Sequence, residues 1–183
     1  MQIAQQKLKE NIAEYILYMY QVEDVIRAYK FDVDEIMEHY VKPQLPDESF
    51  SNQYRSWYND LVRQMKMQKI EKSGHLLSTQ EIMLELSYLH NTLLNMTKDH
   101  KYVTVYETAN KFIEEFKQKS NLKDRNQLEV AFHAMYMKLL LKLQQKEISA
   151  ATEEAFDAMR VMLAYLSQAY RRMKAGDMDF LNN

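Results

Sequence analysis

The sequence predicts an all-α fold, an up-and-down antiparallel bundle of about five to six helices. Its 183 residues include only two Gly and two Pro, and both a β-sheet protein and a glycine-rich phosphate loop need more turn residues than that. Apolar residues recur at the i, i+3, i+4 spacing of amphipathic helices over several long stretches. The 13 Met and 13 Tyr residues suit packing between helices.

The stretch over residues 7–29 is the strongest of these helical patterns, and the rest of the chain is interpreted around it. As a helix it would be about 35 Å long. Its apolar face comprises Leu8, Ile12, Tyr15, Ile16, Met19, Val22 and Ile26. Glu23 interrupts this face. A carboxylate at such a position must be paired, protonated or functional, because burying it without a partner costs too much free energy.

Capping signals divide the remainder of the chain into further helices. A short helix is expected before Pro43, a longer one that closes at Gly74, and others over about residues 78–96, 100–117, 130–143 and 150–175. The predicted starts carry capping residues, namely Asp32 with Glu35, Asp47, Ser78 with Glu81, and Ser149. Residues 1–176 are therefore expected to form a single domain, with residues 177–183 as a loose C-terminal tail.

Composition narrows the classes of function. The formal net charge is −2, from 24 basic and 26 acidic residues, so no large field of one sign is available and nucleic-acid binding is not expected. The chain has no Cys, which excludes disulfides, thiolate metal sites and a cysteine nucleophile and fits a reducing compartment. The sequence shows no signal-peptide pattern and no apolar run of membrane-spanning length. A cytoplasmic protein without membrane contact is expected.

Three stretches carry a family resemblance. They are IAQQKLKENIAEYILYMYQVEDVIRAY at residues 3–29, ELSYLHNTLL at 85–94 and FHAMYMKLLLKLQQKEISAATEEAF at 132–156. With them the chain resembles an uncharacterised domain-of-unknown-function family of Bacteroidetes, over nearly its whole length. The resemblance implies an all-helical fold and a bacterial cytoplasmic setting. It implies no activity and no catalytic residues.

Three polar residues, Glu23, His90 and His133, fall on helix faces that should be buried. Together with Arg27, one turn after Glu23, and Glu129, one turn before His133, they form the candidate polar cluster. In the simpler interpretation they form a satisfied structural network, with Glu23 paired to Arg27 one turn later. In the alternative, Glu23, His90, Glu129 and His133 converge and hold a divalent metal or act beside a small-molecule pocket. The dimetal pattern Glu-x-x-His is absent, which favours the structural interpretation.

These observations favour a non-catalytic protein that acts through helix packing, as a homodimer or as an adaptor for a protein partner. Surplus apolar helix faces and the lack of a strong catalytic motif support this hypothesis. No catalytic residue and no cofactor is predicted. The alternative is a helical bundle that binds a metal or a small ligand through the Glu and His residues of the candidate polar cluster. In this alternative the protein could be an enzyme.

Overall fold

The computed structural model describes residues 2–45 and 47–177. All regular secondary structure in these residues is helical and they contain no β-strand, which confirms the predicted all-α class. They form eight α-helices, whereas the sequence predicted five to six. The bounds are α1 Gln2–Glu10, α2 Ile12–Ala28, α3 Val33–Ile36, α4 Ser51–Met67, α5 Leu77–Asn91, α6 His100–Lys119, α7 Gln127–Leu143 and α8 Ala150–Lys174.

Part of the higher count comes from the first predicted helix, which is two helices. The chain breaks at Asn11, whose backbone is extended (φ −152°, ψ 101°) and whose side chain accepts hydrogen bonds from the backbone N–H groups of Ala13 and Glu14. Ser167 of α8 also accepts from Ala13 N, at 3.2 Å. Asn is a preferred N-cap residue because its side chain competes with the helical backbone bonds. The periodic apolar pattern across residues 7–29 did not reveal this break.

Shorter turns extend three of the helices, and the 3₁₀ turn Glu48–Phe50 leads directly into α4. The α3 helix continues as a π turn over Met37–Val41 and a 3₁₀ turn over Lys42–Gln44. A second π turn, Thr92–Met96, follows α5 directly. The predicted caps at Asp32, Asp47 and Ser149 are confirmed, since each side chain accepts a backbone N–H of the following turn.

Two clusters of buried apolar residues lie on either side of α2. The first combines α2 residues such as Ile12 and Ile16 with α5, α6, α7 and α8. The second combines Met19, Val22 and Ile26 of α2 with α3, the π turn after it, and α4. Because α2 contributes to both clusters, its middle, around Met19 and Tyr20, lies at the place where they meet.

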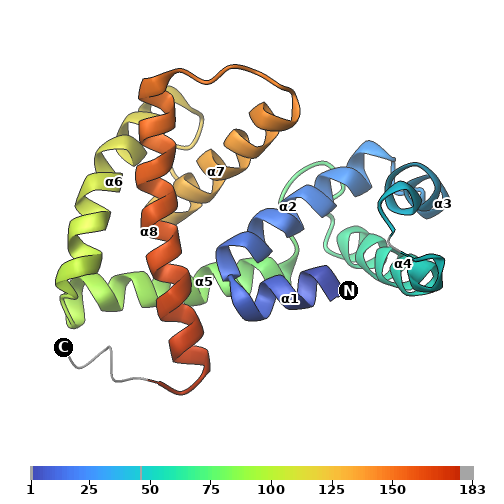
Figure 1. Ribbon diagram of the computed structural model, residues 1–183, viewed down its shortest axis with the longest axis horizontal. Helices are drawn as coiled ribbons and strands as arrows, with labels where there is room; N and C mark the ends of the chain where they lie inside the picture. Colours follow the sequence, from blue (N-terminus) through green and yellow to red (C-terminus); the bar gives the residue numbers. More distant parts are fainter. Residues whose placement is uncertain (1, 46, 178–183) are drawn as a thin grey trace.

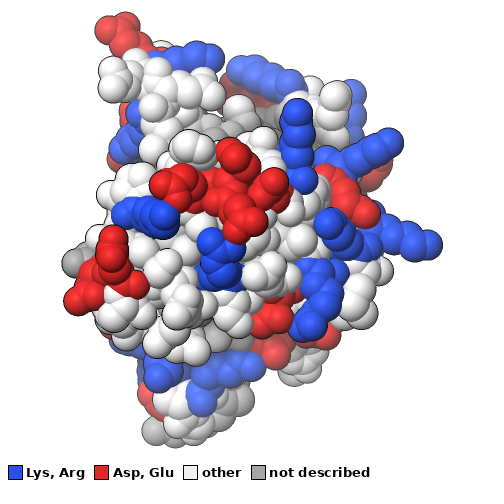
Figure 2. Space-filling model, turned by 90° about the vertical axis from the view of Figure 1, so that its right-hand side faces the viewer, with Lys and Arg blue, Asp and Glu red and all other residues white. Residues whose placement is uncertain are grey.

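Figure 1 shows α6 and α8 running alongside one another, while α5 crosses α8 at a steep angle and α3 and α4 lie at the opposite side of the molecule. The arrangement thus differs from a single up-and-down stack. Figure 2 shows acidic and basic side chains interspersed on the face at that opposite side. No helix in the described ranges is long and apolar enough to cross a membrane. Of the predicted C-terminal tail, Asp177 contacts Arg172, and residues 178–183 lie outside the described residues.

Candidate functional site

Glu23 is fully buried on α2, and its two carboxylate oxygens each accept one hydrogen bond from the linker between α4 and α5. The backbone N–H of Leu76 donates to Oε1 at 2.9 Å, and Nδ1 of His75 lies 2.7 Å from Oε2. A carboxylate has no proton to donate when ionised, so Nδ1 of His75 carries the hydrogen in this contact. Nε2 of His75 has no partner in the described part of the chain. The buried carboxylate therefore fixes the orientation of an imidazole.

The position of Glu23 also explains how α5 begins. The predicted cap at Ser78 with Glu81 is wrong, because α5 starts at Leu77 and its N-cap residue Leu76 has no side-chain cap. The first N–H groups are instead bound by distant side chains: Leu76 N by Glu23, and Leu77 N by Gln68 Oε1 at 2.8 Å. A negative charge is favourable at this end of a helix because the helix dipole is positive there.

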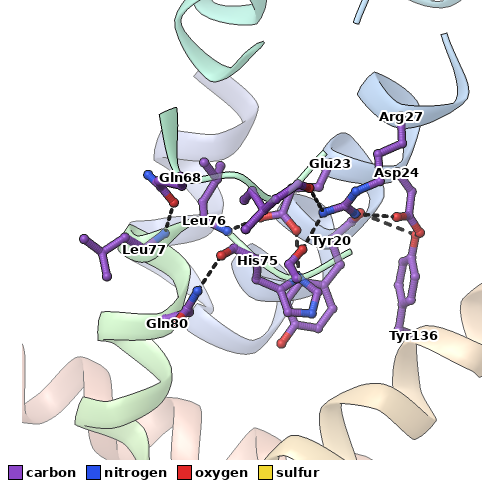
Figure 3. A network of polar contacts seen from close by, with 12 residues as sticks. Tyr20, Glu23, Asp24, Arg27, Gln68, His75, Leu76, Leu77, Gln80 and Tyr136 are labelled. Carbon is purple, nitrogen blue, oxygen red and sulfur yellow. Dashed lines mark hydrogen bonds and ion pairs between the residues drawn. The ribbon is translucent and has the colours of Figure 1, made fainter. Parts of the chain in front are cut away.

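The sequence suggested that Arg27 pairs with Glu23, and in the structure it does not. It binds Asp24 at 2.9 Å, the carbonyl oxygen of Ile70 at 3.2 Å and the carbonyl oxygen of Gly74 at a short distance. The predicted end of α4 at Gly74 is also wrong, since that helix ends at Met67. Gly74 lies in the linker with φ +98°. Arg27 and Glu23 together tie the linker to α2, as Figure 3 shows.

Aromatic groups enclose the same imidazole. The ring of Tyr20 stacks on that of His75 with centroids 3.7 Å apart, and Tyr136 of α7 packs edge-on against Tyr20. The Tyr136 hydroxyl donates to Asp24 at 2.7 Å. Burial, with the nearby carboxylates, raises the pKa of both tyrosines, so both phenols stay protonated at neutral pH. The network thus links α2, the linker, α5 and α7.

Two adjoining cavities of about 360 and 230 Å³ open beside this network. Both are lined by Tyr20, His75, Gln80 and Glu129, and we refer to them together as the His75 cleft. Thr79 also lines the cleft and is only 1% exposed, yet its hydroxyl oxygen has no hydrogen-bond partner among the described residues. A buried hydroxyl without a partner is unfavourable, so this group calls for a bound water or ligand atom.

The α7 side of the cleft supplies the other charged groups. Arg125, Glu129 and His133 line it, and Arg125 binds Glu129 at 3.1 Å. The second carboxylate oxygen of Glu129 accepts from the N–H of Asn126 and completes the capping box of α7. Glu129 is therefore a half-buried capping residue as well as a cleft residue.

His133 is exposed, which corrects the prediction that it points away from water. The buried face of α7 is formed by its neighbours, such as Phe132, Met135 and Tyr136. Partial burial lowers the pKa of the His133 imidazole, and the nearby His75 lowers it further. Two imidazoles thus face the same cleft closely enough to repel each other when both are protonated.

His90 belongs to a different site. It is buried on α5, and its Nδ1 lies 2.6 Å from the hydroxyl of Tyr102. It lines another cavity of about 440 Å³, which we call the His90 cavity and which shares Ser87 and Asn126 with the smaller cavity of the His75 cleft. Glu23, His90, Glu129 and His133 consequently do not surround one point, and the described residues contain no group of three or more His, Cys, Asp or Glu suited to a metal ion.

Sequence reasoning did not identify His75 as a site residue. It lies in a linker without periodicity, 52 positions from Glu23, so no local pattern connects the two. The available signal was Glu23 itself, because a buried carboxylate requires donors and the five histidines are natural candidates.

Comparison with known proteins gives a family and no described activity. No similar chain was found among curated proteins or among solved structures. A family model described as "Domain of unknown function (DUF4924)" matches residues 1–177. This match agrees with the domain-of-unknown-function resemblance inferred from the sequence. The chain therefore belongs to the DUF4924 family.

Proposed function

We propose that the protein binds a small molecule through an anionic group, a carboxylate or a phosphate, in the His75 cleft. The observation that carries the proposal is the Glu23–His75 pair, in which a buried carboxylate holds an imidazole at the cleft with Nε2 unpartnered in the described structure. A preoriented side chain loses little conformational freedom when it binds a ligand, which favours affinity.

The charges around the cleft support an anionic ligand. Arg125 and His133 lie on the α7 side, opposite His75. Arg125 uses one guanidinium nitrogen for Glu129 and keeps further donors for a ligand, because a guanidinium has five N–H groups. A bound anion would also favour the protonated form of His133, whose pKa is lowered by burial and by the nearby His75.

Calorimetric titration with sodium phosphate and, separately, sodium succinate at pH 6.5 tests this proposal. One of the two anions should saturate the protein with a dissociation constant of about 1 mM or lower. Arg125→Gln should weaken that binding about tenfold or more, since it removes a charge-assisted donor. Arg63→Gln is the matched control, because Arg63 on α4 is similarly exposed and also pairs with a carboxylate, Asp60.

The proposal fails if neither anion saturates the protein below about 20 mM, or if Arg125→Gln binds as the unaltered protein does. The divalent-metal alternative has its own test in elemental analysis of protein purified without a chelator. One tightly held metal ion per chain, lost on His133→Ala, would support that alternative.

A second candidate function is packing against a protein partner or a second copy of the chain, and one surface favours it. Leu77, Leu84 and Tyr88 of α5 are 54%, 72% and 71% exposed. Their spacings of seven and four residues place them on one face of the helix. Light scattering at high micromolar concentration should then report a dimer that Leu84→Lys converts to a monomer. A monomeric unaltered protein would contradict the homodimer.

The cellular setting is part of the same proposal. We infer a cytoplasmic location in a bacterium of the Bacteroidetes. The support is the resemblance of the three sequence stretches and the absence of Cys from the 183 residues. Fractionation of the native cells tests the location.

A further inference from the structure

The His90 cavity differs from the His75 cleft in that none of the residues lining it is an acid or a Lys or Arg. Side chains with uncharged polar groups dominate its wall: His90, Asn91, Asn95, Tyr106, Asn126 and Gln127. Its volume of about 440 Å³ lies within the range of small-molecule sites. Since no ionic group is available there, an ionic ligand would lose its hydration without gaining a counter-charge.

The protonation of His90 follows from its surroundings. Burial lowers its pKa to about 4, so the imidazole is neutral at pH 7. Burial also raises the pKa of Tyr102, so its phenol keeps its proton. This buried hydroxyl has no other acceptor among the described residues, so it donates to Nδ1 of His90. The remaining hydrogen of the neutral ring is then on Nε2, a donor that has no partner in the described ranges.

The amide side chains of the wall are also available. Those of Asn91, Asn95 and Gln127 make no hydrogen bond within the described structure, and Asn126 uses only its Oδ1, as the cap of α7. Asn95 lies in the π turn Thr92–Met96 that follows α5. Such π turns are rare and are frequent at functional sites. An amide offers a donor and an acceptor side by side, and this pair matches the edge of a nucleobase.

An aromatic surface completes the cavity. The half-buried ring of Tyr106 lines it and contacts His90 with centroids 5.0 Å apart, in an edge arrangement of 70°. Aromatic side chains stack on planar heterocycles, and this contact tolerates different bases. We propose that the His90 cavity binds an uncharged planar molecule with adjacent hydrogen-bond donors and acceptors, a nucleobase or nucleoside being its chemical class.

The test is a titration of ¹⁵N-labelled protein with adenosine, cytidine and uridine, followed through the side-chain amide signals. At least one nucleoside should shift the Asn91 and Asn95 signals saturably, with a dissociation constant of about 1 mM or lower. Asn91→Asp and Asn95→Asp should each weaken binding about tenfold or more, because each removes a donor and introduces a charge. Both positions are exposed, so the fold is retained.

Asn52→Asp on α4 is the matched control, since Asn52 is exposed and distant from the cavity in sequence and element. It should bind as the unaltered protein does. The proposal is overturned if no nucleoside saturates below about 5 mM, if both Asp variants bind normally, or if methyl glucoside saturates the same signals while the nucleosides do not.

Discussion

His75 and His90 lie at the two ends of α5, and each lines a cavity, yet the protein gives them different chemical partners. His75 precedes the helix and donates to the buried carboxylate of Glu23. His90 lies in the last turn and accepts from the phenol of Tyr102, with no charged partner. The acceptor of His75 is thus a carboxylate, whereas burial beside a phenol favours the neutral ring of His90. The partner, rather than the residue type, decides what each cavity is able to bind.

The largest expected effect comes from removing the Glu23 carboxylate, the hydrogen-bond partner of His75. Glu23→Ala should lower the free energy of unfolding by about 3 kcal/mol, because it leaves the buried Leu76 N–H without an acceptor, removes the partner of His75 and opens a cavity between the two apolar clusters. Urea unfolding at pH 7 measures it.

Glu107→Ala provides the control for that substitution. Glu107 is exposed on α6, so the change should stay within about 0.5 kcal/mol. A loss below about 1 kcal/mol for Glu23→Ala would mean that the linker is held mainly by Arg27, and the central role of the Glu23–His75 pair would be refuted.

The neutral state of His90 is tested by the dependence of protein stability on pH. Since the pKa of His90 is about 4 in the folded protein and about 6.5 in an unfolded chain, the unfolded state binds the extra proton between these values. Stability is therefore lost as the pH falls from 6.5 toward 4. The His90→Gln substitution removes the titrating imidazole and with it this source of pH dependence.

The two proteins should be compared by urea unfolding at pH 7.5 and at pH 4.5. The difference in free energy of unfolding, unaltered protein minus His90→Gln, should fall by about 2.5 kcal/mol between these pH values. Taking the difference cancels the carboxylates that titrate in both proteins. An unchanged difference would show that His90 is protonated in the folded state, and the uncharged character of the His90 cavity would be lost.

The sequence predicted the helical class and most helix starts because these depend on local features. Apolar periodicity and the side chains of Asp32, Asp47 and Ser149 act within one turn. Glu23 was found for the same reason, as a local exception to an apolar face. The burial of single residues was predicted less well. The helical pattern of α7 placed His133 on the buried face, but the structure shows it exposed.

The partners of Glu23 could not be predicted, because they depend on how the linker after α4 returns to α2. The nearest helical neighbour, Arg27, was the natural candidate, but the structure uses it to bind the carbonyl oxygens of Ile70 and Gly74. The separation of His90 from the other candidates has a similar cause. A helical pattern shows which residues are buried and does not show which buried residues of different helices meet.

The smallest effects concern the start of α5, and they separate a local cap from a cap made by distant side chains. Ser78→Ala should change the free energy of unfolding by less than about 0.3 kcal/mol, because the Ser78 side chain caps nothing in the described structure. Gln68→Ala should cost about 1 kcal/mol, since the N–H of Leu77 then loses its acceptor. Ser149→Ala, which removes the side-chain cap of α8, sets the scale for a local cap at about 1 kcal/mol. If Ser78→Ala matched Ser149→Ala while Gln68→Ala had no effect, α5 would begin as its sequence predicts. The start of α5 would then be stable without Glu23 and Gln68. The difference between the His75 and His90 ends of the helix would depend on local sequence alone.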